Sequence, residues 1–200
     1  MIRRPLVGAA ALCGALLLAA CNGSPEAGRV TPAPTNTSSP TVSPSPSASP
    51  TWTGEELKAI TAARSRYVTA RTAVGVALSD PRNASRSPLE KAGNGGNWLA
   101  SAIEEIAFQR DRGWYQAGSV KIASTTVASV RLQLEQPEVM LANCIDSSGV
   151  VMRYRATGKP VPLGPSNGSR HKVHSRIVLA PSINGTKTWF LVDEKVIGSC

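Results

Sequence analysis

Residues 113–134 read GWYQAGSVKIASTTVASVRLQL, and at the start of this stretch the hydrophobic pattern of the 200-residue chain changes its period. Before Gly113, apolar residues recur three or four positions apart, as on one face of a helix. After it, apolar and polar residues alternate, as in a half-buried strand. Helices followed by antiparallel strands indicate an α+β fold, with N-terminal helices packed on an antiparallel sheet.

A long helix is predicted from Thr53 to about Ser79. The sequence Thr53-Gly-Glu-Glu56 fits a capping box. In this motif the side chains of the first and last residues, Thr53 and Glu56, accept hydrogen bonds from backbone N–H groups at the start of the helix. Asp80-Pro81 ends the helix. Apolar side chains three and four residues apart form one stripe that we expect to be buried: Ile60, Ala63, Tyr67, Ala70, Val74 and Leu78.

A further helix is predicted over Trp98–Arg112, with Asn97 as its N-cap and Gly113 just past its end. The inward face of this helix is expected to hold Trp98, Leu99, Ala102, Ile103 and Ile106. Residues 80–97 are expected to form a loop, with one helical turn at 88–92.

The alternating part of the chain predicts six strands, at 115–123, 126–134, 139–144, 150–155, 172–179 and 188–197. Turn-forming residues separate them. Asn184-Gly185 is a strong signal for a tight hairpin between the last two strands, because both residues tolerate positive φ.

The N-terminus predicts export and lipid attachment. Arg3 and Arg4 precede an apolar run from Leu6 to Ala20, which is too short for a membrane-spanning helix and fits a secretory signal peptide over residues 1–20. Leu18-Ala-Ala-Cys21 resembles the bacterial lipobox, whose cysteine takes a diacylglyceryl group and becomes the mature N-terminus. Cys13 fits less well, because Leu12 before it is not small.

Residues 21–52 comprise this cysteine and a linker rich in Ser, Thr and Pro. With so few aliphatic side chains a disordered tether is expected, and the folded domain follows over 53–200. The net charge is +9, or +7 without Arg3 and Arg4, which favours contact with anionic lipid headgroups or cell-wall polymers. No basic block is interleaved with aromatic residues, so we expect no nucleic-acid partner.

Two cysteines, Cys144 and Cys200, remain after Cys13 leaves with the signal peptide and Cys21 is acylated. In a domain that is exported to an oxidising compartment, two such cysteines most simply form a disulfide. A metal site would need more ligands, and the sequence holds no nucleophile motif, phosphate-binding loop or metal-ligand cluster. We therefore expect a Cys144–Cys200 disulfide, no metal, no cofactor and no catalytic residues.

The order of elements resembles the NTF2-like fold, also called cystatin-like or SnoaL-like. More narrowly, residues 53–200 resemble the small NTF2-like lipoproteins of actinobacteria. The matching features are the lipobox and linker, Ala142-Asn-Cys-Ile-Asp-Ser-Ser148, Thr157-Gly-Lys-Pro160, the basic strand at 170–179, and Thr188-Trp-Phe-Leu-Val192 before the terminal cysteine. The resemblance implies a strongly curved sheet that forms a cone around a cavity, and it implies no particular reaction.

Tyr67 and Arg71 are the candidate ligand contacts, because they lie one helical turn apart on the helix that would line the cone. Arg71, at the edge of the apolar stripe, would meet an anionic group of a ligand or else reach solvent or pair with a structural carboxylate. Trp189, like Trp98 and Trp114, is interpreted as part of the core and the cavity wall.

The other polar residues are interpreted as structural. His171 and His174 lie three apart on one strand and therefore point to opposite faces. Asp146 is expected to cap a turn, while Asp193 and Glu194 are expected to face solvent near Lys195.

A basic patch would form if two of the predicted strands were neighbours. Arg153 and Arg155 share one face of the first, and Lys172 and Arg176 share one face of the second. A solvated sheet face explains these four residues equally well.

Together these features favour a non-catalytic binding or accessory module, anchored by lipid on the extracytoplasmic face of the cell membrane. Its partners would be the membrane itself, anionic lipid, a cell-wall polymer or another envelope protein. Two alternatives stay open: a small SnoaL-like or isomerase-like enzyme that uses the cone cavity, and a prophage-type surface lipoprotein that interferes with infection. An acid or base buried in a closed pocket would favour the enzyme.

Overall fold

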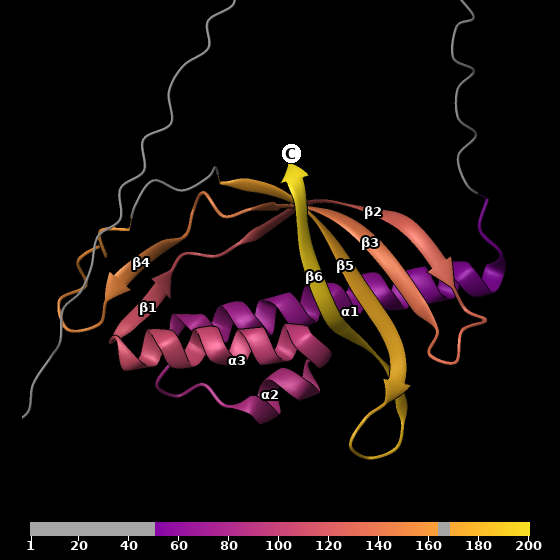
Figure 1. Cartoon of the computed structure of the whole chain (residues 1–200), viewed down its shortest axis with the longest axis horizontal. Helices are drawn as coiled ribbons and strands as arrows, with labels where there is room; N and C mark the ends of the chain where they lie inside the picture. Colours follow the sequence, from indigo (N-terminus) through magenta and orange to yellow (C-terminus); the bar gives the residue numbers. More distant parts are fainter. Residues whose placement is uncertain (1–50, 164–168) are drawn as a thin grey trace, which may run out of the picture. The chain divides into compact units, whose positions relative to one another are not determined.

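The computed structural model describes residues 51–163 and 169–200. The predicted signal peptide, Cys21 and the linker up to residue 50 lie outside the described residues. The elements, in chain order, are α1 Gly54–Ser79, α2 Arg86–Lys91, α3 Gly96–Asp111, β1 Trp114–Ala117, β2 Lys121–Arg131, β3 Glu138–Asp146, β4 Val151–Tyr154, β5 Arg170–Pro181 and β6 Lys187–Ser199 (Figure 1). In the part of the chain so described, no helix is long and apolar enough to cross a membrane.

The strands form two antiparallel sheets, so the fold is mixed α+β as predicted. The larger sheet has the strand order β2-β3-β5-β6, and β1 pairs with β4 in a separate two-stranded sheet. Figure 1 shows the long strands of the larger sheet bending across α1, with β1 and β4 near the C-terminal ends of α1 and α3.

Helix α1 confirms the predicted capping box. The Thr53 N–H donates to Glu56 Oε2 at 2.8 Å, and the Glu56 N–H donates to Thr53 Oγ1 at 3.3 Å. The buried stripe also matches the prediction closely, except that Ala77 is buried where Leu78 was expected, and Ala59 joins it. Its members are Ala59, Ile60, Ala63, Tyr67, Ala70, Val74 and Ala77.

The predicted start of α3 is wrong, because Gly95 rather than Asn97 is the N-cap. Gly96, the first helical residue, has a φ of +52°, which a side chain disfavours. A Cβ at Gly96 would also lie 2.9 Å from the carbonyl oxygen of Val192. The glycine thus lets the helix begin directly against β6.

The predicted strand at 115–123 is also wrong, because a turn divides it. Gly118 has a φ of +81°, and a Cβ there would lie 1.9 Å from the carbonyl oxygen of Gly149. The chain turns at this glycine, so β1 and β2 enter different sheets. The hairpin at Asn184-Gly185 is confirmed, since β5 and β6 pair up to Pro181 and Lys187 around it.

The main core lies between α1 and the larger sheet. The fully buried Tyr67 packs there with Leu141, Ile177 and Leu191, one from each of β3, β5 and β6. Trp52 packs against the same cluster, so the folded region includes this residue, which the sequence assigned to the linker. A second cluster joins α1, α2 and α3.

The predicted disulfide is confirmed. Cys144 on β3 is bonded to Cys200, with 5.9 Å between the two Cα atoms. Because β5 lies between β3 and β6 in the sheet, the bond ties the end of the chain to β3 across β5.

Candidate functional site

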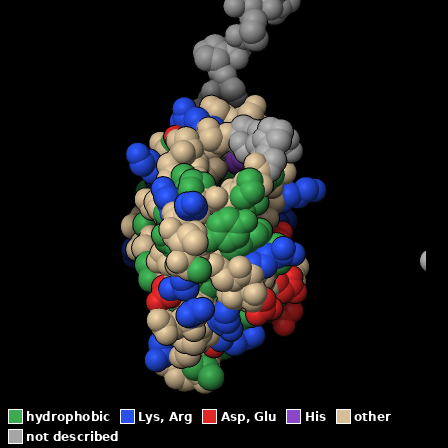
Figure 2. Space-filling model, turned by 90° about the vertical axis from the view of Figure 1, so that its left-hand side faces the viewer, with side chains coloured by type: hydrophobic (Ala, Val, Ile, Leu, Met, Phe, Trp, Pro, Cys, Tyr) green, Lys and Arg blue, Asp and Glu red, His purple; other side chains and the backbone are tan. Residues whose placement is uncertain are grey.

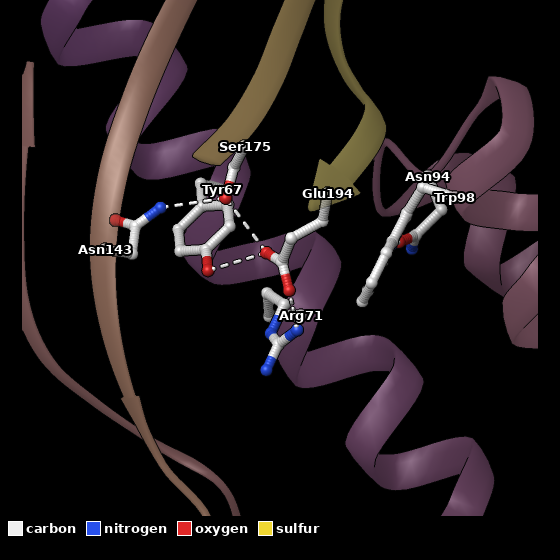
Figure 3. Close-up of polar contacts among 7 residues, drawn as sticks. All are labelled: Tyr67, Arg71, Asn94, Trp98, Asn143, Ser175 and Glu194. Atoms are coloured by element: carbon white, nitrogen blue, oxygen red, sulfur yellow. Dashed lines mark hydrogen bonds and ion pairs between the residues drawn. The ribbon is translucent and has the colours of Figure 1, made fainter. Parts of the chain in front are cut away.

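A buried carboxylate, Glu194 on β6, lies at the centre of a polar cluster between α1 and the larger sheet (Figure 3). Its side chain is 7% exposed, and its Oε1 lies 2.5 Å from Arg71 Nη1. The hydroxyl groups of Tyr67 and Ser175 both donate to Oε2, at 2.9 Å each. A carboxylate removed from water needs such partners, because desolvation of an unpaired ion costs several kcal/mol.

The expectation that Glu194 faces solvent is wrong, and a β-bulge is the reason. Arg176 pairs with Asp193, but the next residue of β5, Ile177, pairs with Leu191, so Val192 is the extra residue on β6. A bulge shifts the alternation of inward-pointing and outward-pointing side chains along the strand by one position. Asp193 therefore points outward, and Glu194 enters the interior opposite Ser175.

The polar cluster extends from Glu194 in two directions. On one side, Asn143 donates from Nδ2 to Ser175 Oγ at 2.9 Å. On the other, the Arg71 guanidinium carbon lies 5.2 Å from the centroid of the Trp98 ring. The Trp98 Nε1–H donates to Asn94 Oδ1 at 2.6 Å. Arg71 is thus held between a carboxylate and an indole ring.

The hydroxyl of Tyr67 stays protonated over an unusually wide pH range. Burial raises the pKa of Tyr67 far above its ordinary value of 10.0, and the negative charge of Glu194 raises it further. Tyr67 is therefore a hydrogen-bond donor to Glu194 at every physiological pH.

A cavity of about 360 Å³ lies beside this cluster, between α1, Trp98, β1 and the start of β2. Its wall is mainly apolar. The polar residues in it are Arg71, Gln116, Thr72, Ser79 and Ser119. The apolar side chains of the wall are Val74, Val76, Leu78, Trp98, Val120 and Ile122. The volume lies at the small end of the 300–1,000 Å³ range that is typical of small-molecule sites.

The structure brings two of the three predicted contact residues together. Tyr67 and Arg71 share the carboxylate of Glu194, but only Arg71 lines the cavity. Trp189 packs on the main core and does not line it. Glu194 and Gln116 were missed, and no local sequence signal marks either one.

The condition for the basic patch is not met, because the two strands that carry its residues are not neighbours. β4 belongs to the two-stranded sheet and β5 to the larger sheet. Arg153 donates to the carbonyl oxygen of Gly158 at 2.7 Å, and Arg155 pairs with Asp80 at 2.7 Å. Arg176 lies 3.7 Å from Glu138, and Lys172 is exposed. Figure 2 shows Lys and Arg side chains spread around hydrophobic ones on one face, rather than in one block.

The other polar residues singled out in the sequence do not line the cavity. Asp146 caps its turn as expected, since its Oδ1 accepts the Ser148 N–H at 2.9 Å. Hydrogen bonds from the side chain and the backbone of Ser148 lower the pKa of the Asp146 carboxyl group. His171 and His174 do not line the cavity. Across residues 51–163 and 169–200, no three His, Cys, Asp or Glu side chains are placed to hold a metal ion.

Comparison with known proteins finds a distant structural likeness. No family model and no curated protein matches the chain. Among solved structures, it is similar to the intermembrane space region of the chloroplast protein ARC6, with a TM-score of 0.47 and 11% identity over 72% of this chain and 97% of that chain. A likeness this distant carries no argument about what the protein does.

Proposed function

We propose that this protein is a lipoprotein, anchored through Cys21 on the extracytoplasmic face of the membrane, and that its NTF2-like domain is a non-catalytic binding module. The cavity beside Arg71 is its binding site. The observation that carries the proposal is the separation of this cavity from the acid. Glu194 does not line the cavity, and both its oxygens already accept hydrogen bonds.

This arrangement supports binding over acid–base catalysis. A general base must lie within hydrogen-bond reach of the proton that it removes from a substrate. Among the described residues that line the cavity, Arg71 is the only ionisable one, and it is already paired with Glu194.

Gly75 leaves free space at the wall of the cavity. It lines the cavity from α1, and no heavy atom lies within 4 Å of the position that its Cβ would take. Glycine inside a helix costs about 0.5–1 kcal/mol relative to alanine. No neighbouring side chain fills this space, so it is free to accommodate a ligand.

A photoreactive probe tests the binding site in the full-length protein, in its own membrane vesicles. The probe is a long-chain alcohol that carries a diazirine group, and mass spectrometry locates the labelled peptides. We expect labelling of α1 and of residues 116–122 in the wild type, and loss of that labelling in Gly75→Leu, whose side chain would take up part of the cavity. Gly54→Leu, on the same helix and equally free of neighbours, should label as the wild type does.

The anchor has its own test. Cys21→Ala removes the thiol that would carry the lipid, and we expect the protein to move from the membrane fraction to the soluble fraction. Acyl chains on Cys21 would each add about 0.8 kcal/mol of membrane affinity per buried CH₂ group. A Cys21→Ala protein that stays fully membrane-bound would contradict the anchor.

A further inference from the structure

Gln116 on β1 is a largely buried residue whose side-chain amide opens into the cavity and makes no hydrogen bond to the described part of the protein. The residue is 7% exposed and lines the cavity. Among residues 51–163 and 169–200 the fully buried side-chain atoms without a hydrogen-bond partner are Gln109 Oε1 and Asn143 Oδ1, so the Gln116 amide differs from these in being reachable from the cavity. The amide of Gln116 is therefore available to a polar group inside the cavity.

Arg71 offers further donors at the same wall. A guanidinium group has five N–H donors, and Arg71 is bonded through Nη1 alone to Glu194 among the described residues. Its side chain is 16% exposed, and no Asp or Glu side chain lines the cavity. A carboxylate in the cavity would accept hydrogen bonds from Arg71 and Gln116 without meeting a like charge on the wall.

The rest of the cavity fits an elongated apolar body. Its α1 wall runs from Arg71 to Ser79, which corresponds to about 12 Å along the helix axis. Val120 and Ile122 face this stretch from the start of β2. A polar group placed at Arg71 would therefore leave an apolar groove that follows the helix.

We infer that the cavity takes a single-chain amphiphile with a carboxylate head, which binds Arg71 and Gln116 while the alkyl chain lies along α1 toward Ser79. The inference rests on the proposed binding function and names its ligand class. Glu194 already neutralises the charge of Arg71. The carboxylate head of the ligand therefore contributes to binding through its hydrogen bonds and not through attraction to an unpaired charge. Its contribution to affinity is therefore moderate.

A matched pair of diazirine probes tests this inference in membrane vesicles that hold the full-length protein. One probe is a long-chain carboxylate and the other is the alcohol of the same chain length. We expect the carboxylate to label the cavity peptides about tenfold more strongly than the alcohol, as for one hydrogen bond to a charged group. In Gln116→Met, which keeps the length of the side chain, the preference for the carboxylate over the alcohol should fall at least threefold.

Each outcome has a distinct meaning. Equal labelling of the wild type by carboxylate and alcohol would overturn the inference about the head and leave the binding function intact. An unchanged preference in Gln116→Met would remove Gln116 from the head site. Absence of cavity labelling by both probes would overturn the proposed function itself. Arg71 is left intact in these variants because its loss would leave Glu194 unpaired.

Discussion

At the scale of single residues, the pair of Arg71 and Glu194 connects the core to the cavity. Removal of one partner of a buried ion pair leaves the other charge uncompensated, which costs about 3–5 kcal/mol. We therefore expect Arg71→Leu to lower the free energy of unfolding by that amount in chemical denaturation. Asp193→Asn, at the exposed neighbouring position, should change it by less than about 0.5 kcal/mol. A loss below 1 kcal/mol in Arg71→Leu would show that the pair is not buried in solution.

Tyr67 makes a prediction about pH. Its pKa is raised in the folded protein above the ordinary 10.0, so above pH 10 the unfolded chain releases a proton that the folded chain keeps. The contribution of Tyr67 to stability is complete below pH 10 and is lost as the pH rises further. The slope approaches about 1.4 kcal/mol per pH unit.

The control for this prediction is Tyr67→Phe. We expect it to be less stable at pH 8, because Glu194 loses a donor. Its stability should also fall less steeply between pH 10 and 11.5 when urea unfolding is followed by circular dichroism. Parallel curves for wild type and Tyr67→Phe above pH 10 would contradict the burial of the hydroxyl.

At the scale of elements, Gly75 lowers the stability of α1 through its low helix propensity, although the space around it would allow a larger residue. Gly75→Ala should raise the free energy of unfolding by about 0.5–1 kcal/mol, because alanine loses less conformational freedom on folding. Gly96→Ala should do the opposite, since its φ is +52° and its Cβ would meet the Val192 carbonyl oxygen at 2.9 Å. Thermal unfolding measures both changes, and destabilisation by Gly75→Ala would contradict the open space beside it.

Local signals predicted the elements well. The capping box of Thr53 and Glu56 and the three-to-four spacing of apolar residues located α1, because both act within a few turns of one helix. The Asn184-Gly185 hairpin was predicted for the same reason, since two residues determine its geometry.

Contacts between distant residues determined what the sequence could not predict. β1 and β2 separate because Gly118 lies against Gly149, and the N-cap of α3 is Gly95 because Gly96 lies against β6. The candidate site depends on such contacts most of all. Glu194 turns inward only because Val192 is bulged against β5, and a bulge leaves no pattern in the sequence of one strand.

At the scale of the whole molecule, the disulfide between Cys144 and Cys200 restrains the end of the chain. The two cysteines are 56 residues apart, and closure of a loop of that length in the unfolded chain predicts a stabilisation of about 4 kcal/mol. We expect the double variant Cys144→Ser, Cys200→Ser to unfold at a correspondingly lower urea concentration. An unchanged midpoint would contradict this contribution.

The cavity beside Arg71 is the proposed binding site, and the most direct measurement identifies what that cavity holds. Full-length wild type and Gly75→Leu would be purified side by side from the same membranes, extracted with organic solvent, and the extracts compared by mass spectrometry. We predict a stoichiometric amount of a single-chain carboxylate amphiphile with the wild type and a loss of that compound with Gly75→Leu. Identical extracts from the two proteins would contradict ligand binding in this cavity.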